Sequence, residues 1–259
     1  MPKVSIIIAY YRNIGFLKLV LKGFCNQSEN SFEVIIAEDD NTLNLDQDLQ
    51  GCEYIKRLNI QHVNQENKGF RKCRILNKAI NCAKSDYIVF IDGDCIPHQS
   101  FVKEYIKLKD YDCVFGRRVM LNESYTNTLV KQKEELSIAK VIFNSSKTKH
   151  AFYIPFRKPT QESNKGIWGC NWGLHKKYLE QVNGFDMDYQ NAGVGEDVDI
   201  EWRLRAEMIT IHYVKHRPIV YHLHHSTHYD NSVVQKGMKL LESKKRQNLS
   251  FCLNGLNQV

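Results

Sequence analysis

Two carboxylates separated by one glycine, Asp92-Gly93-Asp94, follow a short apolar run at residues 87–91. The run has the length and the β-branched content of a buried strand. Ionised carboxylates need partners inside a sheet, so we expect both aspartates at the carboxyl end of the strand, where open α/β sheets bind ligands. Two hard oxygen ligands on a tight turn suit a divalent cation that carries a diphosphate. An ordinary Asp-Gly turn explains the tripeptide equally well, so the rest of the chain must decide.

A second acidic element, Glu196-Asp197-Val198-Asp199, opens a predicted helix that runs to Met208. Acidic residues in the first turn of a helix are favoured by the helix dipole, and this alone could explain them. Glycines at positions 193 and 195 would instead expose the carboxylates toward a cleft. Both interpretations fit this segment taken by itself.

Histidines gather near the end of the chain, after a strand-like run at residues 219–221. They occupy positions 222, 224, 225 and 228. A lone histidine is usually a surface or core residue, whereas four within seven residues indicate a metal site. The sequence has no CxxC pair to complete a zinc site, so we expect a metal that carboxylate and phosphate oxygens already hold, with histidine as an added ligand.

The segment at residues 166–173 is rich in glycine and tryptophan, with Trp168 and Trp172 near its middle. Glycines permit close approach of the backbone to a ligand. Indole faces suit either sugar rings or core packing, and the sequence does not choose between them.

Strands and helices alternate around these residues. Apolar runs predict strands at 4–9, 33–37, 60–64 and 87–91, and helical spacing predicts helices at 14–27 and 75–83. This order, with short connections, is typical of a parallel sheet with helices on both faces. Beyond it, the patterns predict a helix at 101–108, a strand at 112–116, helical stretches at 129–142 and a long loop at 147–165. Loops of that length are often lids or binding loops.

Each early strand ends in polar residues at the same edge of the predicted sheet. Tyr10 and Tyr11 could stack a base, Asp39 could accept a hydrogen bond from a base or a ribose, and Arg71 and Arg74 could pair with phosphate. The sequence has neither GxGxxG after the first strand nor GxxxxGK[ST] anywhere. Phosphate would therefore be bound through a metal and arginines rather than through a glycine-rich loop.

Length and composition limit the size of the domain, its partners and its location. The 259 residues suffice for one large α/β domain, and no apolar run approaches the roughly 20 residues that span a bilayer. The net charge of +7 suits an anionic partner, whether a nucleotide diphosphate, a phospholipid or a nucleic acid. The N-terminus lacks the layout of a signal peptide, and the eight scattered cysteines favour a reducing compartment, so we expect a cytoplasmic location. A narrow apolar stripe at 234–241, beside several lysines, predicts a helix that docks on the domain or lies on an anionic membrane.

Taken together and in order, these segments resemble the inverting nucleotide-sugar glycosyltransferases of family 2, nearest to the chondroitin-polymerase and β-1,4-galactosyltransferase-like branch. The resemblance runs from Val4 to about His225. It rests on the segments at 5–11, 36–40, 67–71, 92–94, 183–186 and 195–197 and on His222. It implies the Rossmann-like A-type glycosyltransferase fold, an α/β fold with a mostly parallel central sheet flanked by helices. Residues 1–229 would form the catalytic domain, with a nucleotide-sugar-binding half (1–116), an acceptor-binding half (117–229) and a basic amphipathic helix after it (230–259).

The resemblance also implies roles for individual residues. Asp39 would contact uracil, Asp92 would lie near the ribose and sugar, and Asp94 would bind Mn²⁺ or Mg²⁺. His222 would be the second metal ligand, with His225 in reserve. Asp197 would be the general base, and Glu196 would hold the acceptor. The nucleotide-sugar-binding candidates are Ala9, Tyr11, Asp39, Arg71, Arg74, Asp92 and Gly93; the acceptor-binding candidates are Glu196, Trp168, Asn171 and Trp172.

The implied activity is transfer from a nucleotide sugar, with UDP as the expected nucleotide, to a saccharide or lipid-linked saccharide hydroxyl in the synthesis of surface polysaccharide or lipopolysaccharide. Peripheral contact with the inner face of the cell membrane would suit the basic C-terminal helix. Three alternatives remain: a nucleotide-sugar-binding module that acts only within a complex, a metal-dependent nucleotidyltransferase, and a nucleic-acid-binding protein. Clustered acids at strand ends argue against nucleic acid. A nucleotidyltransferase would leave Glu196-Asp197 and the histidines unexplained.

Overall fold

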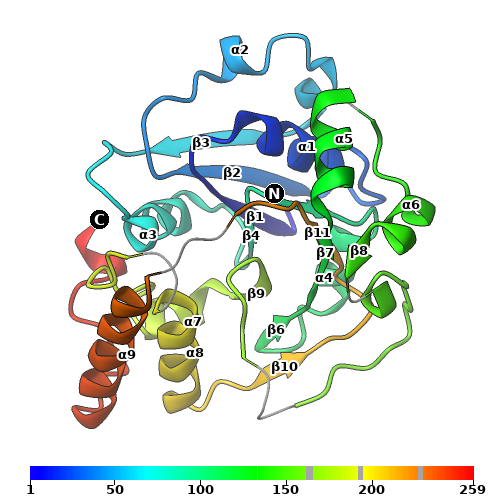
Figure 1. Ribbon diagram of the computed structural model, residues 1–259. Coiled ribbons are helices and arrows are strands. Elements are labelled where there is room, and N and C mark those ends of the chain that lie inside the picture. The colour runs from blue at the N-terminus through cyan, green and yellow to red at the C-terminus, as the bar shows by residue number, and fades with distance from the viewer. Residues whose placement is uncertain (133, 147, 162–165, 192–194, 227–229) are drawn as a thin grey trace.

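A seven-stranded sheet forms the centre of the described residues, which are 1–132, 134–146, 148–161, 166–191, 195–226 and 230–259 of the computed structural model (Figure 1). Its strand order is β10-β6-β9-β4-β1-β2-β3. Only β9 runs antiparallel to its neighbours, which confirms the predicted mostly parallel sheet. The strands are β1 (Val4–Tyr10), β2 (Phe32–Glu38), β3 (Ile60–Asn64), β4 (Tyr87–Asp92), β6 (Cys113–Phe115), β9 (Asn171–His175) and β10 (Ile211–Tyr213).

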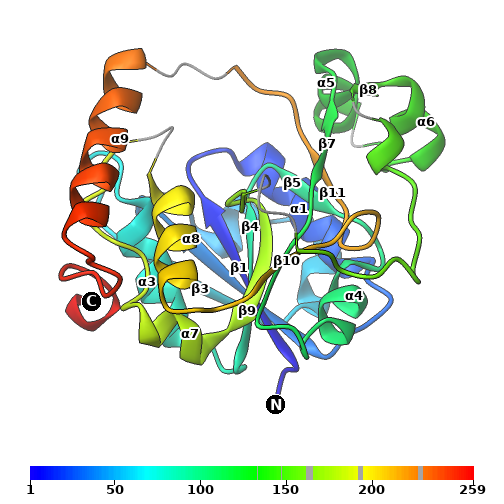
Figure 2. The same ribbon diagram turned by 90° about the horizontal axis from the view of Figure 1, so that it is seen from below.

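Helices cover both faces of this sheet because its strands are apolar on both sides (Figure 2). In β1, for example, Ile6 and Ile8 enter one apolar cluster and Ile7 enters the other. On the first face pack α1 (Ile14–Cys25) and α4 (Phe101–Lys107); on the second pack α3 (Lys72–Cys82), α7 (Lys176–Gln181) and α8 (Glu196–Ala206). The parallel strands consequently present their carboxyl ends along one uncovered edge.

A second, smaller sheet, which the sequence patterns did not predict, lies beside this edge. Its order is β5-β11-β7-β8, with bounds Cys95–Pro97, Val220–His222, Arg118–Leu121 and Ser145–Ser146. Antiparallel pairing of β11 with β5 sets His222 opposite Cys95. Segments more than a hundred residues apart in the chain are thus brought to one place.

The less regular parts of the chain follow the prediction in outline. The helical stretch expected at 129–142 is two helices, α5 (Glu123–Gln132) and α6 (Ile138–Phe143). The long loop expected at 147–165 contains, in its described part, only the 3-10 turn η2 (Thr148–His150) and one isolated bridge from Thr160. The remaining short elements are α2 (Leu45–Asp48), η1 (Glu53–Arg57) and η3 (Leu256–Gln258).

The C-terminal helix α9 (Asn231–Arg246) docks on the domain, beside α8 (Figures 1 and 2). Leu241 is fully buried, and the Lys244 ammonium pairs with Asp186 and, at 2.6 Å, with Asp188. The side-chain amide of Asn183 donates to the Cys252 carbonyl at 2.6 Å. The turn that begins at Asn183 therefore anchors the C-terminal segment.

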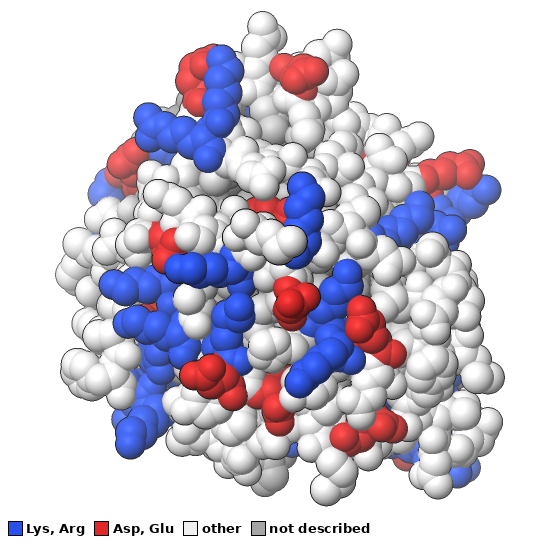
Figure 3. Space-filling model, turned by 180° about the vertical axis from the view of Figure 1, so that it is seen from behind, with Lys and Arg blue, Asp and Glu red and all other residues white. Residues whose placement is uncertain are grey.

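Within the described parts of the chain, no helix combines the length and the apolar character that crossing a bilayer requires. Basic side chains occur in groups on the rear face of the molecule, with acidic side chains among them (Figure 3). The excess of positive charge is therefore spread over mixed surfaces on this face.

Candidate active site

The uncovered edge of the main sheet brings the predicted nucleotide and metal residues together. β1 and β4 pair so that Ala9 lies opposite Asp92. The backbone N–H of Gly93 donates to the Ala9 carbonyl at 2.8 Å. A side chain at Gly93 would meet that carbonyl oxygen at 3.0 Å, so glycine suits the close approach of the two strands. The turn after β4 is thereby fixed to the end of β1.

Asp39 lies at the carboxyl end of β2 and is almost fully buried. It accepts hydrogen bonds from the Gln65 amide at 2.6 Å and from the backbone N–H of Arg71 at 2.7 Å. Burial raises the pKa of Asp39, against these two hydrogen bonds. Each carboxylate oxygen keeps a further lone pair for a donor on a ligand. Tyr11, 54% exposed, directly follows the neighbouring strand β1, and the guanidinium carbon of Arg12 lies 5.1 Å from its ring centroid.

The two predicted phosphate arginines hold the segment that leads into α3. The Arg71 guanidinium donates to the Glu66 carbonyl, while its Nε is buried without a partner among the described residues. Arg74 donates to the Gln65 side chain at 3.3 Å. Gln65 in turn supports Asp39, so both arginines stabilise the loop around that carboxylate. Contact of either arginine with phosphate stays a prediction.

Asp94, His222 and His225 converge at the junction of the two sheets. The Asp94 carboxylate lies 3.5 Å from Nε2 of His222 and 3.0 Å from Nε2 of His225. Burial alone would raise the pKa of Asp94, but the hydrogen bond from His225 and the charge of His222 lower it to about 2. Burial lowers the pKa of His222, whereas the bond to Asp94 raises that of His225. A carboxylate beside a neutral imidazole is a donor set that binds a divalent cation.

Cys95 completes a group with Asp94 and His222 whose ligand atoms all lie within 4.8 Å of one another. Its thiol is fully buried and donates to Asp94 at 3.2 Å. Burial, helped by Cys170 and Asp94, holds the pKa of this thiol well above its usual value. A protonated thiol is a poor ligand for a hard cation, so we assign Cys95 to the support of Asp94.

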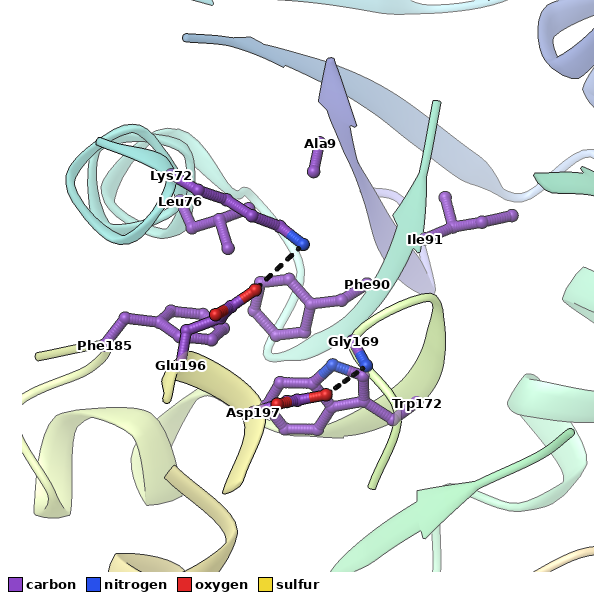
Figure 4. Close-up of a pocket in the computed structure, with 10 residues that line it drawn as sticks. All are labelled: Ala9, Lys72, Leu76, Phe90, Ile91, Gly169, Trp172, Phe185, Glu196 and Asp197. Atoms are coloured by element: carbon purple, nitrogen blue, oxygen red, sulfur yellow. Dashed lines mark hydrogen bonds and ion pairs between the residues drawn. The ribbon is translucent and has the colours of Figure 1, made fainter. Parts of the chain in front are cut away.

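Lys72, the first residue of α3, lines a small pocket that Asp92 adjoins. Its ammonium lies 3.1 Å from the Asp92 carboxylate. It also lies 3.4 Å from the Glu196 carboxylate (Figure 4). The residues that line the pocket are Ala9, Lys72, Leu76, Phe90, Ile91, Gly169, Trp172, Phe185, Glu196 and Asp197. The pocket therefore joins the ends of β1 and β4 to the start of α8.

Asp197 faces the same pocket from the first turn of α8 (Figure 4). Its carboxylate accepts from the backbone N–H of Gly169 at 3.3 Å and from that of Val198 at 2.9 Å. Burial, and the neighbouring charge of Glu196, raise the pKa of Asp197 to about 6. A carboxylate with a pKa of about 6, placed at a pocket, suits a general base.

Two of the predicted acceptor residues belong to the core. Asn171 is fully buried, and its side chain bonds to the Tyr105 hydroxyl at 2.7 Å and to the carbonyls of Arg117 and Pro218 at 3.0 and 2.8 Å. Trp172 is fully buried and stacks on Phe90, with ring centroids 4.6 Å apart. The prediction that Asn171 contacts the acceptor is wrong, because β9 turns its side chain into the protein, whereas Trp172 also lines the pocket and its contact with the acceptor stays a prediction.

Trp168 remains a candidate for acceptor contact, although its ring is already occupied in part. The guanidinium carbons of Arg117 and Arg118 lie 4.4 and 4.9 Å from its ring centroid. Sequence reasoning missed Arg118 as well as Lys72. Nε of Arg118 is buried without a partner among the described residues. Neither residue belongs to a periodic pattern. Both can be identified as site residues only in the structure, where the fold places them near acidic residues from distant segments.

Comparison with known proteins places these residues in a family. The sequence model described as Glycosyl transferase family 2 matches residues 5–182, and the model described as N-terminal domain of galactosyltransferase matches residues 152–226. A chondroitin synthase from Escherichia coli is 26% identical over 224 residues, and one from Pasteurella multocida (strain Pm70) is 28% identical over 233. Each alignment covers 79% of this chain, but only 32% and 23% of the respective relative. The chain thus spans a third or less of the length of these relatives.

Solved structures show the same fold at low sequence identity. S. aureus TarS superposes with a TM-score of 0.65 at 14% identity, covering 93% of this chain and 39% of the other. The mannosyltransferase PcManGT from Pyrobaculum calidifontis, in complex with GDP-Man and Mn²⁺, superposes with a TM-score of 0.61 at 15% identity, covering 95% of this chain and 64% of the other. These similarities confirm the predicted A-type glycosyltransferase fold.

Proposed function

The chain belongs to glycosyl transferase family 2, and from this premise we propose that it is an inverting, metal-dependent transferase that moves a sugar from a UDP donor to a saccharide hydroxyl. One observation carries the proposal: Asp92 and Asp197, the donor-side and acceptor-side carboxylates, are joined through Lys72 and Glu196 around a single pocket. A donor sugar and an acceptor hydroxyl would meet there.

The nucleotide would lie along the ends of β1 and β2. Tyr11 offers an exposed ring for stacking, and Asp39 offers a carboxylate for the N–H of uracil. The pyrimidine assignment rests on the family resemblance rather than on this group, since a carboxylate can accept from the N3–H of uracil or from the N1–H and amino group of guanine. Among the solved neighbours, one complex of TarS holds UDP-GlcNAc and PcManGT holds GDP-Man, so the fold itself does not select the base.

The donor set at the junction of the sheets fits a divalent cation. Asp94, His222 and His225 would hold Mn²⁺ or Mg²⁺. When bound, the cation would neutralise negative charge on the diphosphate leaving group. The chain's own contribution is to fix Asp94, which the Cys95 thiol and the two imidazoles hold in its ionised form.

The reaction we propose is a single displacement at the anomeric carbon. Asp197 takes the proton of the acceptor hydroxyl as its oxygen forms a bond to that carbon. The bond from the carbon to the diphosphate breaks, and the nucleoside diphosphate leaves. One base on the face opposite the leaving group inverts the configuration. The backbone donors Gly169 and Val198 hold the Asp197 carboxylate in place while leaving it lone pairs for the acceptor.

The products of the similar proteins suggest the setting. The chondroitin synthases and a hyaluronan synthase from Pasteurella multocida, 25% identical over 227 residues, are named for polysaccharides. We propose that the acceptor is a growing saccharide chain of a surface polysaccharide, with the division into donor and acceptor halves at residue 116. Contact with the membrane surface and a cytoplasmic location belong to the same proposal.

The test is a screen of nucleotide sugars for transfer to oligosaccharides, with and without Mn²⁺. We expect UDP-sugars to be used, activity to require a divalent cation, and the product to have the opposite anomeric configuration to the donor by NMR. Thermal stabilisation by GDP and not by UDP would overturn the assignment of Asp39 to uracil. Full activity in the presence of EDTA would overturn the role of Asp94 and the histidines.

A further inference from the structure

Three charged groups line the pocket and a fourth, Asp92, adjoins it; of these four only Lys72 is positive. Lys72 comes from α3, Asp92 from the end of β4, and Glu196 and Asp197 from the first turn of α8. Lys72 contacts a carboxylate on each side, 3.1 Å from Asp92 and 3.4 Å from Glu196. Its side chain is 20% exposed, so water screens these interactions only in part.

The ammonium is held firmly in its charged state. Burial alone would lower the pKa of Lys72, but the charges of Asp92 and Glu196 outweigh burial and hold the pKa well above its usual value. Without Lys72, three carboxylates from two elements would lie close together in a poorly solvated place. Like charges in such a setting raise one another's pKa values, and at least one carboxylate would take up a proton.

We propose that Lys72 is a positioning residue, which ties the start of α8 to the end of β4 and keeps Asp197 ionised as the base. The inference rests on the proposed function, in which Asp197 accepts the proton. It adds a residue that does not contact the reacting atoms but controls the protonation state of Asp197, which does contact them.

The charged surroundings of Asp197 are few, so the effect of Lys72 can be isolated. Glu196 is the neighbouring charge on its own helix, and Lys72 is the charge that faces it from α3. From the described part of the loop before β9, the backbone N–H of Gly169 donates to the Asp197 carboxylate. Asp92 contacts the ammonium of Lys72 at 3.1 Å. Removing the lysine therefore leaves Asp197 beside Glu196 with no compensating cation among these neighbours.

The location of Lys72 also links the base to the nucleotide end of the site. The preceding residue, Arg71, donates its backbone N–H to Asp39 at 2.7 Å. Lys72 begins α3 directly after this bond. The backbone next to Lys72 is therefore held by Asp39, the proposed uracil contact, and the ammonium of Lys72 is held by the two carboxylates.

The experiment titrates the Asp197 carboxyl itself, so that it does not depend on turnover. The protein is labelled with ¹³C at aspartate side chains, and the resonance of Asp197 is identified by its loss in Asp197→Asn. In wild type we expect a midpoint of about 6. In Lys72→Met we expect a midpoint about one unit higher, at the low end of the range for loss of a nearby opposite charge. Lys72→Arg, which keeps the charge, should titrate as wild type does.

The matched control is Lys78→Met, the same change six residues further along α3, where the ammonium donates to the Asn64 carbonyl at 3.4 Å and has no carboxylate partner among the described residues. It should leave the midpoint unchanged. In transfer assays the acid limb of the profile of kcat/KM against pH should shift as the resonance does. An unchanged midpoint in a folded Lys72→Met protein would overturn the inference, even if activity fell. If the wild-type protein shows no transfer but the Asp197 midpoint still shifts in Lys72→Met, the proposed function is contradicted and this inference is not.

Discussion

The proposed base makes the rate of transfer depend on pH in a defined way. The pKa of Asp197 is raised to about 6, chiefly by burial and then by the charge of Glu196. Only the ionised carboxylate can take the proton of the acceptor. kcat/KM should therefore rise with pH and level off above the pKa. At about pH 5, one unit below it, roughly a tenth of the molecules would carry an active base, so kcat/KM should fall about tenfold from its plateau.

Protons also compete with a cation at the metal site, and this effect must be separated from the titration of the base. Protonation of His222 or His225 would compete with the cation, so activity lost through the metal is restored by more metal. Activity lost through Asp197 is not. The assay therefore measures initial rates of UDP release between about pH 5 and pH 8 at two concentrations of Mn²⁺, about tenfold apart.

An acid limb that stays near pH 6 at both concentrations supports Asp197 as the base. Asp197→Asn should then lower kcat/KM by on the order of 10²–10⁴ and abolish the limb. A limb that moves down by a large part of a pH unit with added Mn²⁺ would show that metal binding limits the rate. A limb that persists unchanged in Asp197→Asn would refute the assignment of the base.

Three further changes test other parts of the site and fold. His222→Ala should weaken Mn²⁺-dependent binding of UDP by about tenfold or more, measured by calorimetry, whereas the exposed His224→Ala should not. Asp39→Ala should weaken binding of UDP in the same assay by about tenfold or more, because a hydrogen bond to a charged group contributes about 1.5–3 kcal/mol. Asp186→Asn should lower the free energy of unfolding by urea by about 1.5–3 kcal/mol, since the nearly buried Lys244 loses one of its two carboxylate partners and keeps Asp188; Lys245→Met, whose pair with Glu242 is exposed, should cost less than about 1 kcal/mol.

The sequence was sufficient for the strands of the main sheet that carry local apolar runs. The strands predicted at 4–9, 33–37, 60–64 and 87–91 all occur, each within one or two residues of the expected bounds. Their order could not be predicted in full, because β9 enters between β4 and β6 from a distant part of the chain. A short strand that contains a glycine and an asparagine gives almost no local signal, although tertiary pairing completes it.

The same limit explains the error at Asn171 in the acceptor half. The pattern of glycine and tryptophan at 166–173 allowed either sugar stacking or core packing, and the resemblance favoured the first. In the structure Trp172 stacks on Phe90 and Asn171 bonds to three interior groups. Which face a residue of β9 presents depends on the register with β4, and that register is not written in the segment itself.

Lys72 is a different kind of omission. It lies next to Arg71, in a segment whose arginines are predicted to contact phosphate, and no separate role is predicted for the lysine. The structure turns Lys72 toward carboxylates from two other elements and turns Arg71 toward its own loop. The residue type determines that the side chain of Lys72 is positive, but only the packing of the fold determines which carboxylates it contacts.

The tripeptide Asp92-Gly93-Asp94 shows why two similar carboxylates take different roles. β4 ends at Asp92 and β5 begins just after Asp94, so the turn passes from the main sheet to the smaller one. The bond from Gly93 to the Ala9 carbonyl fixes the turn at its middle. Asp92 thus faces the pocket and Lys72, while Asp94 faces the histidines of the second sheet. One carboxylate can face the transferred sugar and the other a cation on the leaving group only if the two point to opposite sides of this junction. The glycine between them allows the two strands to approach closely, and this makes the separation possible within three residues.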